Sequence, residues 1–261
     1  MSNPVEVSFT TYAEAVTSAL ELLGAAQRLE KQTRVLVKPN LINDSHPPVT
    51  TPVACCEAVV AYVRRVSGAE VCVAEGCGDP SLNTSQVFKR LGYDEMARKA
   101  GVALIDLNLA DTQLLTNSAC TVFPEFHMPK VAMESFIISV PVLKAHSLAQ
   151  ITGSLKNMMG LAVPKHYQAG GHWKKSAFHR RMQDSILDLN RYRTPDLTVM
   201  DATVGLADYH LGGRRCSPPV GKIVAGYDAQ AVDRRAAELL GLNWRGIRHL
   251  SEPFGGESAV T

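Results

Sequence analysis

Short apolar runs alternate with longer segments in which apolar residues recur at helical spacing along most of the chain. Runs rich in β-branched residues and bounded by Gly, Pro or polar residues indicate strands, and a period of three to four indicates helices. They predict strands over 1–10, 33–37, 71–74, 102–107, 136–142, 197–200 and 222–225, and helices over 11–30, 51–68, 83–100, 174–193 and 228–240. This alternation predicts an α/β fold with a mostly parallel sheet and helices on both faces.

Two segments interrupt the alternation. Residues 108–134 are expected to be irregular or to form a small β excursion, and residues 143–195 form a helical or loop insertion between two predicted strands. The helix over 51–68 has the best end signals, with Thr51 as cap, Pro52 in the first turn and Gly68 after the last. We expect one α/β domain over 1–250 that includes the insertion, followed by a frayed tail over 251–261.

Composition narrows the class of protein. The 261 residues are 46% hydrophobic and 20% charged, with a formal net charge of +2. This balance gives no basic field for nucleic acid, and the low aromatic content provides few base-stacking platforms. No apolar run is long enough to span a membrane, and the N-terminus lacks the layout of a signal peptide. We therefore expect a cytoplasmic protein with neither nucleic acid nor membrane as partner.

Six cysteines are scattered along the chain, and none forms a C-x-x-C pair. Disulfides are not expected in a cytosolic protein of this size. The cysteines are then either buried or free thiols, or ligands of a metal or iron–sulfur site assembled from distant positions. Cys77, between two glycines, and Cys216 are the candidates for the second interpretation.

Polar residues follow nearly every predicted strand at the point where the strand ends. They are Lys38, Asn40, Glu75, Asp106, Lys144, His146, Asp201 and Asp228. Ligands of open parallel sheets bind beyond the carboxyl ends of the strands, so these side chains are expected to face one crevice. The alternative is that the strands simply lead into polar loops. A lysine or aspartate directly after a buried run is nevertheless costly to desolvate unless it is paired or holds a ligand.

The segment 136–172 carries the densest candidate chemistry. Lys144 and Lys156, together with Lys38, could hold an anion, while His146 could exchange a proton near neutral pH. His166 and His172 flank A-G-G, which suggests either a lid with surface histidines or a pair of metal ligands. Neither a phosphate loop nor the G-x-G-x-x-G fingerprint is present, so a standard NAD or ATP motif is missing.

Five sequence blocks together resemble the family catalogued as domain of unknown function 362. The blocks are V-L-V-K-P-N-L at 35–41, V-A-E-G at 73–76, S-V-P-V-L-K-A-H at 139–146, T-G-S-L-K-N-M-M-G at 152–160 and A-G-Y-D-A-Q-A-V-D at 225–233. Members of that family are often joined to a ferredoxin-like iron–sulfur module. This chain has no C-x-x-C-x-x-C segment, so the resemblance implies a separate ferredoxin-like redox partner or a role for the scattered cysteines.

A weaker likeness is to the N-terminal domain of nickel-dependent lactate racemase-type enzymes. Lys38 to Asn40, His146, Lys156 and then His166 or His172 fall in the order of that family's substrate loop, histidine, cofactor-bearing lysine and further histidine. The chain departs from it by having Lys-Pro-Asn in place of an Asp-His-Thr-Arg loop, and K-N-M-M-G in place of a Gly-Gly-Lys setting. The likeness implies a site location and an architecture, not the racemase reaction.

We hypothesise an enzyme, oxidoreductase or racemase-like, that binds a small anionic, carboxylate-bearing substrate or cofactor at the carboxyl ends of the strands. Lysine and histidine supply acid–base chemistry, with an iron–sulfur cluster or transition metal assisting a redox reaction. The residues assigned are His146, Lys156 and Lys144 for catalysis; Lys38, Asn40, Glu75, Asn157, Asp201 and Asp228 for substrate; and His166, His172, Cys77 and Cys216 for metal. The alternative is a non-catalytic binding or carrier protein for an iron–sulfur centre or metal cofactor. A nucleotide-dependent ligase or kinase is disfavoured by the missing phosphate loop.

Overall fold

The computed structural model describes residues 3–254, and its centre is a nine-stranded sheet. The strands of that sheet are β1 (Val5–Ser8), β2 (Arg34–Pro39), β3 (Glu70–Glu75), β4 (Ala103–Asp106), β7 (Phe136–Val140), β8 (Val142–His146), β9 (Gln150–Thr152), β10 (Leu197–Leu206) and β11 (Lys222–Gly226). A separate hairpin pairs β5 (Thr112–Thr116) with β6 (Glu125–Pro129), which is the small β excursion expected between residues 108 and 134.

The main sheet runs in the order β1-β11-β10-β7-β2-β3-β4. Strands β10, β7, β2, β3 and β4 are parallel neighbours, whereas β11 runs antiparallel to both of its neighbours, β10 and β1. After Pro141 the chain continues from β7 into β8, which also pairs in parallel with β10 and carries the antiparallel β9. The predicted class, α/β with a mostly parallel sheet, is confirmed.

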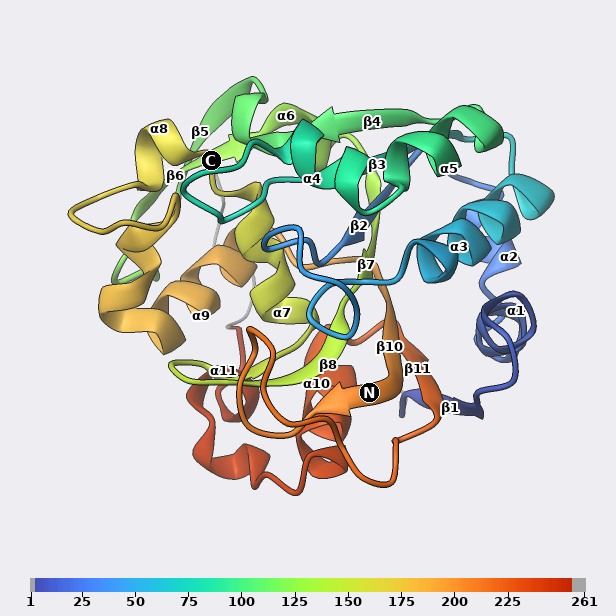
Figure 1. The fold of residues 1–261 in the computed structure, drawn as a ribbon. Coiled ribbons are helices and arrows are strands. Elements are labelled where there is room, and N and C mark those ends of the chain that lie inside the picture. Colours follow the sequence, from blue (N-terminus) through green and yellow to red (C-terminus); the bar gives the residue numbers. More distant parts are fainter. Residues whose placement is uncertain (1–2, 255–261) are drawn as a thin grey trace.

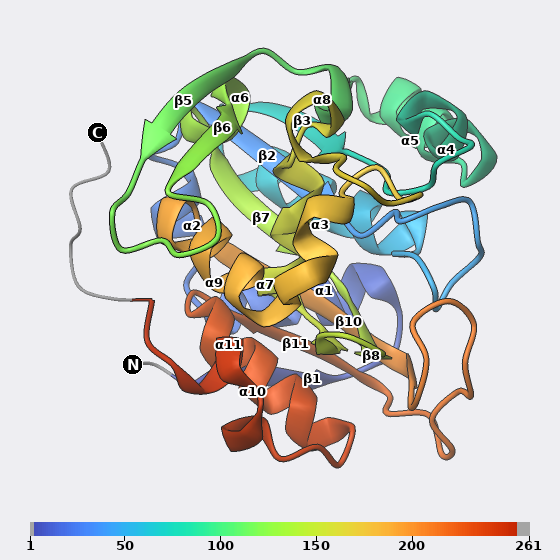
Figure 2. The ribbon, with the colours of Figure 1, turned by 90° about the vertical axis from the view of Figure 1, so that its left-hand side faces the viewer.

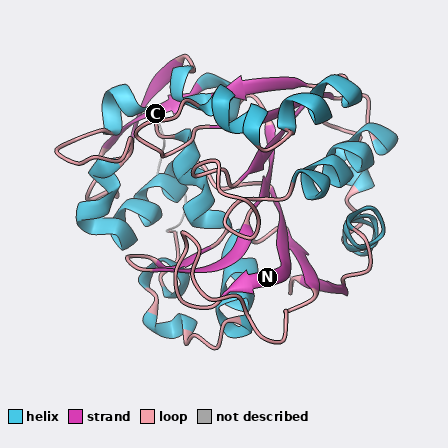
Figure 3. Cartoon of the chain, viewed as in Figure 1, coloured by secondary structure: helices cyan, strands magenta, loops and turns pink. Residues whose placement is uncertain are grey.

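Helices cover both faces of this sheet (Figures 1 and 3). The helices are α1 (Tyr12–Leu22), α2 (Ala26–Leu29), α3 (Val53–Val66), α4 (Thr84–Arg90), α5 (Tyr93–Ala100), α6 (Lys130–Met133), α7 (Ser154–Asn157), α8 (Pro164–Tyr167), α9 (Met182–Tyr192), α10 (Ala229–Leu239) and α11 (Arg248–Ser251), with 3-10 turns η1 (Leu107–Leu109), η2 (Met158–Leu161), η3 (Ser176–Arg181) and η4 (Trp244–Gly246). Alternation along β2 divides the core: Val35 and Val37 pack with α1 and α3, and Leu36 packs on the opposite side. This period of two is what a strand covered on both faces requires.

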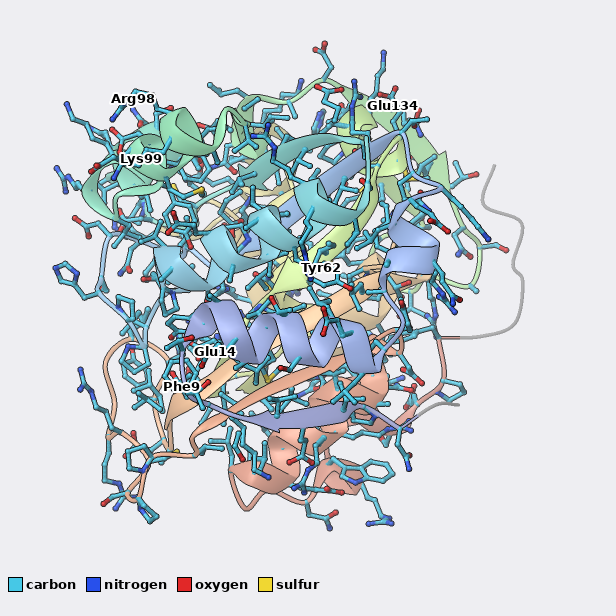
Figure 4. The ribbon with its side chains drawn as sticks, turned by 90° about the vertical axis from the view of Figure 1, so that its right-hand side faces the viewer. Phe9, Glu14, Tyr62, Arg98, Lys99 and Glu134 are labelled. Carbon is cyan, nitrogen blue, oxygen red and sulfur yellow. The ribbon has the colours of Figure 1, made fainter. Side chains whose placement is uncertain are left out.

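Helices α1 and α3 lie side by side in front of the sheet in Figure 4. The ion pair between Arg65 and Glu21, 3.1 Å long, joins them at the surface. Thr51 does not cap α3 as expected. Its hydroxyl donates to the Val140 carbonyl (2.7 Å) and accepts from the Asn40 amide (2.8 Å), so it ties the loop after β2 to β7.

The opposite face is covered by the segment predicted as an insertion. Figure 2 shows α7 and α9 in front of the central strands, with α10 and α11 beside them. The segment 143–195 contains β8, β9, α7 to α9 and two 3-10 turns, and its apolar side chains share one core cluster with the sheet. The single helix expected over 174–193 is therefore η3 followed by α9.

Two other predicted helices are each divided in the structure. The segment 11–30 becomes α1 and α2, and 83–100 becomes α4 and α5, with Gly24 and Gly92 between the halves at positive φ. Of the tail predicted to be frayed, residues 255–261 lie outside the described part of the chain. None of the helices between residues 3 and 254 is long and apolar enough to cross a membrane.

Candidate functional site

A buried ion pair lies at the carboxyl ends of β2 and β3. The Lys38 ammonium is 2.8 Å from Glu75 Oε1, and both side chains are almost fully buried. Glu75 also accepts backbone hydrogen bonds from Gly76 (2.7 Å) and Leu41 (3.1 Å). Burial lowers the pKa of Lys38, while the charge and hydrogen bond of Glu75 act in the opposite direction. The two strand-end residues are thus used together, because neighbouring parallel strands place them side by side.

Two glycines from distant blocks close over this pair. A Cβ at Gly160 would lie within 3.0 Å of both Glu75 Oε1 and Lys38 Nζ, and one at Gly76 would lie within 3.0 Å of the Gly160 carbonyl oxygen. Real Cβ atoms do not approach that closely, so a side chain at either position would displace the pair or its backbone. The glycines of E-G-C-G and K-N-M-M-G are therefore explained by close packing around one ion pair.

Asn157 connects this pair to the short helix α7. Its amide nitrogen donates to the Lys38 carbonyl (3.1 Å) and Ser139 Oγ (3.0 Å), and its oxygen accepts from the Asn40 side chain (3.1 Å). Asp233 of α10 holds the other end of α7, accepting from the amides of Ser154 (2.6 Å) and Leu155. Burial raises the pKa of Asp233 to about 7, against the effect of these hydrogen bonds. Helix α7 is thus fixed at both ends by buried polar groups.

A pocket of about 60 Å³ opens beside the ion pair. It lies between the loops after β2 and β3, helix α7 with η2, and the segment before η3. The lining residues are Asn40, Leu41, Ile42, Glu75, Gly76, Gly78, Lys156, Asn157, Met159, Gly160, Trp173 and Lys175. The volume holds only a few water-sized groups, so the pocket suits a small ligand or one end of a larger one.

Lys175 is a pocket residue that the sequence analysis missed. Its ammonium donates to the carbonyls of Ala162 (2.6 Å) and Gly160 (3.2 Å) and to Asn108 Oδ1 (2.8 Å). Burial lowers its pKa to about 7, although Glu75 favours the charged form. The signal available in the sequence was the pair of lysines after Trp173, which the helical pattern over 174–193 assigned to a helix instead.

Lys156 lies on the pocket lining with a different environment. Its side chain is half-buried, and its amine has no hydrogen-bond or ion-pair partner among residues 3–254. Burial and then the positive charge of Lys38 lower its pKa to about 8. A free amine with this pKa can act as acid or base near neutral pH.

Lys144 and His146 lie outside the pocket lining but close enough to interact with Lys156. Lys144 is buried and donates to the Val49 carbonyl (2.6 Å), and burial lowers its pKa well below the ordinary value, with a further contribution from Lys156. His146 Nδ1 accepts from the amides of Leu148 (3.0 Å) and Ala149 (3.1 Å). Nδ1 therefore carries the lone pair, and a neutral ring keeps its proton on Nε2.

A second histidine, missed by the sequence analysis, stacks on His146. The ring of His210 lies 3.7 Å from it between centroids, and His210 Nδ1 is buried without a hydrogen-bond partner in the described residues. Burial and then Lys156 lower the pKa of both rings, that of His210 to about 3. Both imidazoles are therefore neutral at physiological pH.

Asp201 and Asp228 are not brought to the pocket, against the expectation of a shared crevice. Asp201 accepts from the Tyr12 hydroxyl (3.2 Å) and the Thr203 amide (3.0 Å), so its carboxylate is on the face covered by α1. Asp228 caps α10 through the Ala231 amide (3.0 Å). Because β11 is antiparallel, Gly226 pairs with Thr198 at the start of β10, and Asp228 follows at the opposite end of the sheet.

The four candidate metal ligands do not form one donor set. His166 is exposed on α8 and stacks on His127, His172 is exposed in the following loop, and Cys77 is buried with Sγ 3.3 Å from the Leu82 carbonyl. Cys216 lies in the loop after β10 against Gly205. Within residues 3–254, no three His, Cys, Asp or Glu side chains are grouped as metal ligands would be. As placed between residues 3 and 254, these four residues therefore do not form a donor set for a metal or cluster.

The fold and the pocket define an α/β protein with a lysine-lined pocket at the carboxyl ends of its parallel strands. The family described as domain of unknown function (DUF362) matches residues 35–238, and the chain belongs to that family. The matched range contains Lys38, Glu75, Lys156 and Lys175, so the whole pocket lies within the family's domain. A search of curated proteins found no match.

Proposed function

We propose that the protein is an enzyme that binds a small carboxylate-bearing anion in the pocket and acts on it by lysine-based acid–base chemistry. The observation that carries the proposal is the charge balance. Four lysines lie close enough for the pKa of each to respond to another of these lysines or to Glu75: Lys38, Lys144, Lys156 and Lys175. Glu75 is the one carboxylate on the pocket lining within residues 3–254.

Buried charges are costly unless they are paired, and one glutamate cannot neutralise several ammonium groups. Because the charged form is costly to bury, the pKa of each lysine is lowered, which favours the neutral amine. A bound carboxylate would supply the missing negative charge and favour the protonated amines again. Lysine ammonium groups and the Asn40 amide are suitable donors for such an anion.

The acid–base roles follow from the partners of each amine. Lys175 uses its three N–H groups on protein acceptors and contributes positive charge to the pocket, whereas the Lys156 amine has no acceptor within residues 3–254 and is free to exchange a proton with the ligand. His146, neutral and oriented by two backbone amides, is a second group that could relay a proton through Nε2. Asn157 and Asn40 position α7 and one side of the pocket.

The test is a binding and exchange experiment with acetate, lactate, oxalate and inorganic phosphate. We expect the carboxylates to bind in isothermal titration and to raise the melting temperature. Lys156→Met should weaken binding by about tenfold or more, because hydrogen bonds to charged groups contribute about 1.5–3 kcal/mol. Lys175→Met should also weaken binding, because it removes a positive charge from the pocket lining. Lys89→Met is the matched control, since Lys89 is exposed on α4. Absence of binding by every carboxylate would refute the proposal.

Deuterium exchange separates an enzyme from a carrier. In D₂O, acid–base chemistry should introduce deuterium at the carbon next to the carboxylate of a bound ligand, detected by NMR. Binding without exchange would favour the alternative, a non-catalytic binding or carrier protein.

The cytoplasmic location and the redox component are also proposals. All six cysteines are free, which suits a reducing compartment. Assistance by an iron–sulfur cluster or transition metal, and by a ferredoxin-like partner, would require donors beyond the sets found in residues 3–254. Elemental analysis of anaerobically purified protein is the measurement that tests it.

A further inference from the structure

The four lysines around the pocket differ in whether the amine has a hydrogen-bond acceptor. Lys38 donates to Glu75, Lys144 donates to Val49, and Lys175 has three oxygen acceptors. The amine of Lys156 alone has no acceptor in the described part of the chain, although it is on the lining of the pocket. Three lysines are therefore held as structural or binding cations, and one has an available lone pair when neutral.

The surroundings of Lys156 favour that neutral form. Burial and then the positive charge of Lys38 lower its pKa to about 8, and no carboxylate of residues 3–254 acts in the opposite direction. This pKa leaves about a tenth of the amine unprotonated at pH 7. Desolvation next to another cation is a general way in which proteins activate a lysine as a nucleophile toward carbonyl groups.

A second unpartnered polar atom lies on the same pocket. Asn40 Oδ1 is buried and accepts no hydrogen bond in residues 3–254, while the amide nitrogen of that side chain is bound to Asn157. An unused acceptor on the same pocket as a free amine suits a hydroxyl-bearing adduct, because addition of an amine to a carbonyl creates one hydroxyl group.

We propose that Lys156 forms an imine with the carbonyl group of a small 2-oxo carboxylate bound in the pocket. This rests on the proposed function, since the carboxylate of the same molecule would be attracted by the Lys175 charge and would accept from the Asn40 amide. The pocket of about 60 Å³ limits the part of the ligand inside it to a few non-hydrogen atoms.

The step is balanced and involves no oxidant. The Lys156 nitrogen lone pair adds to the carbonyl carbon, and one amine proton passes to the carbonyl oxygen, giving a carbinolamine whose hydroxyl can donate to Asn40 Oδ1. Loss of that oxygen as water, with the second amine proton, leaves the carbon–nitrogen double bond. The imine then withdraws electrons from the carbon bonded to it on the side away from the carboxylate, so that a proton on that carbon becomes more acidic.

The experiment traps the imine in the full-length protein. Pyruvate or glyoxylate is added with cyanoborohydride, which reduces an imine to a stable secondary amine, and the modified lysine is located by peptide mass spectrometry. We expect one adduct per chain at Lys156, formed faster than at exposed Lys89, and no fast adduct in Lys156→Met. Lys156→Arg keeps the charge and should also give none. Labelling of Lys156 at the rate of Lys89 would overturn the proposal.

Acetate separates this inference from the proposed function, because it has a carboxylate but no carbonyl carbon that can form an imine. Acetate should slow labelling of Lys156 by competition, and it should bind without forming an adduct itself. If acetate and pyruvate bind but no adduct forms at Lys156, the imine is refuted and the carboxylate site stands. If neither binds, both proposals fail.

Discussion

The polar residues that the sequence predicted at strand ends have different partners in the two halves of the sheet. In the parallel half, Lys38 and Glu75 leave neighbouring strands and pair at the edge of the pocket. In the half that contains β10 and β11, Asp201 lies inside β10, which continues to Leu206 instead of ending at residue 200, and accepts from Tyr12 and Thr203, while Asp228 caps a helix. The same sequence feature therefore leads to a pocket in one half and to local structure in the other.

Strand direction and side-chain face account for the difference. β2 and β3 run in parallel, so their carboxyl ends meet. β11 runs antiparallel to β10, which moves Asp228 to the other end, and Asp201 projects to the face of α1 instead of the face of α7. A polar residue at a strand end thus indicates a site only when both the direction of its strand and the face of its side chain agree with those of its neighbours.

The largest expected effect comes from Glu75→Ala in the parallel half. The substitution leaves Lys38 buried without its counterion, and removing one partner of a buried pair costs about 3–5 kcal/mol. The free energy of unfolding, measured in urea, should fall by this amount. A loss below about 1 kcal/mol would mean that the pair is dispensable and that the two halves do not differ as described.

Gly160→Ala should have the next largest effect. The new methyl group would meet Glu75 Oε1 and Lys38 Nζ, and overpacking of a buried site costs roughly 1–3 kcal/mol. Gly68→Ala is the matched control, since nothing lies within 4 Å of a Cβ at that position. Comparable unfolding curves for the two variants would contradict the close packing of K-N-M-M-G on the ion pair.

Asp228→Ala tests the other half of the sheet. Loss of an N-cap side chain typically costs about 1 kcal/mol, so the midpoint of urea unfolding should shift modestly. Carboxylate binding in the pocket should be unchanged, as measured by isothermal titration. Impaired binding in this variant would show that Asp228 contributes to the site after all.

The effect of Lys156→Met on stability should depend on pH. The pKa of Lys156 is lowered in the folded protein, so between pH 8 and about 10.4 the unfolded chain binds more protons. The free energy of unfolding of the wild-type protein should therefore rise with pH across this window. The rise is complete above the window and has not begun below it. Urea titrations across the window should show a smaller rise for Lys156→Met, and an identical rise would contradict the lowered pKa.

Much of this architecture was determined by the sequence alone. Local periodicity specified the central strands, their helices and the α/β class, because burial on one or both faces repeats with the geometry of each element. Lys38 and Glu75 were identified without a motif, since a charged residue directly after a buried run already indicates a partner or a ligand. Lys156 and Asn157 were also identified, from the glycine-bounded cationic segment after β7.

Other features were decided only by the tertiary structure. Lys175 reaches the pocket because η3 replaces the start of a predicted helix, and His210 stacks on His146 from a loop that has no periodic signal. The antiparallel direction of β11 moved Asp228 away. These outcomes depend on which strands pair and on which face a loop returns to, and such contacts join residues far apart in the sequence. Periodicity records whether a side chain is buried, but it does not record what that side chain is buried against.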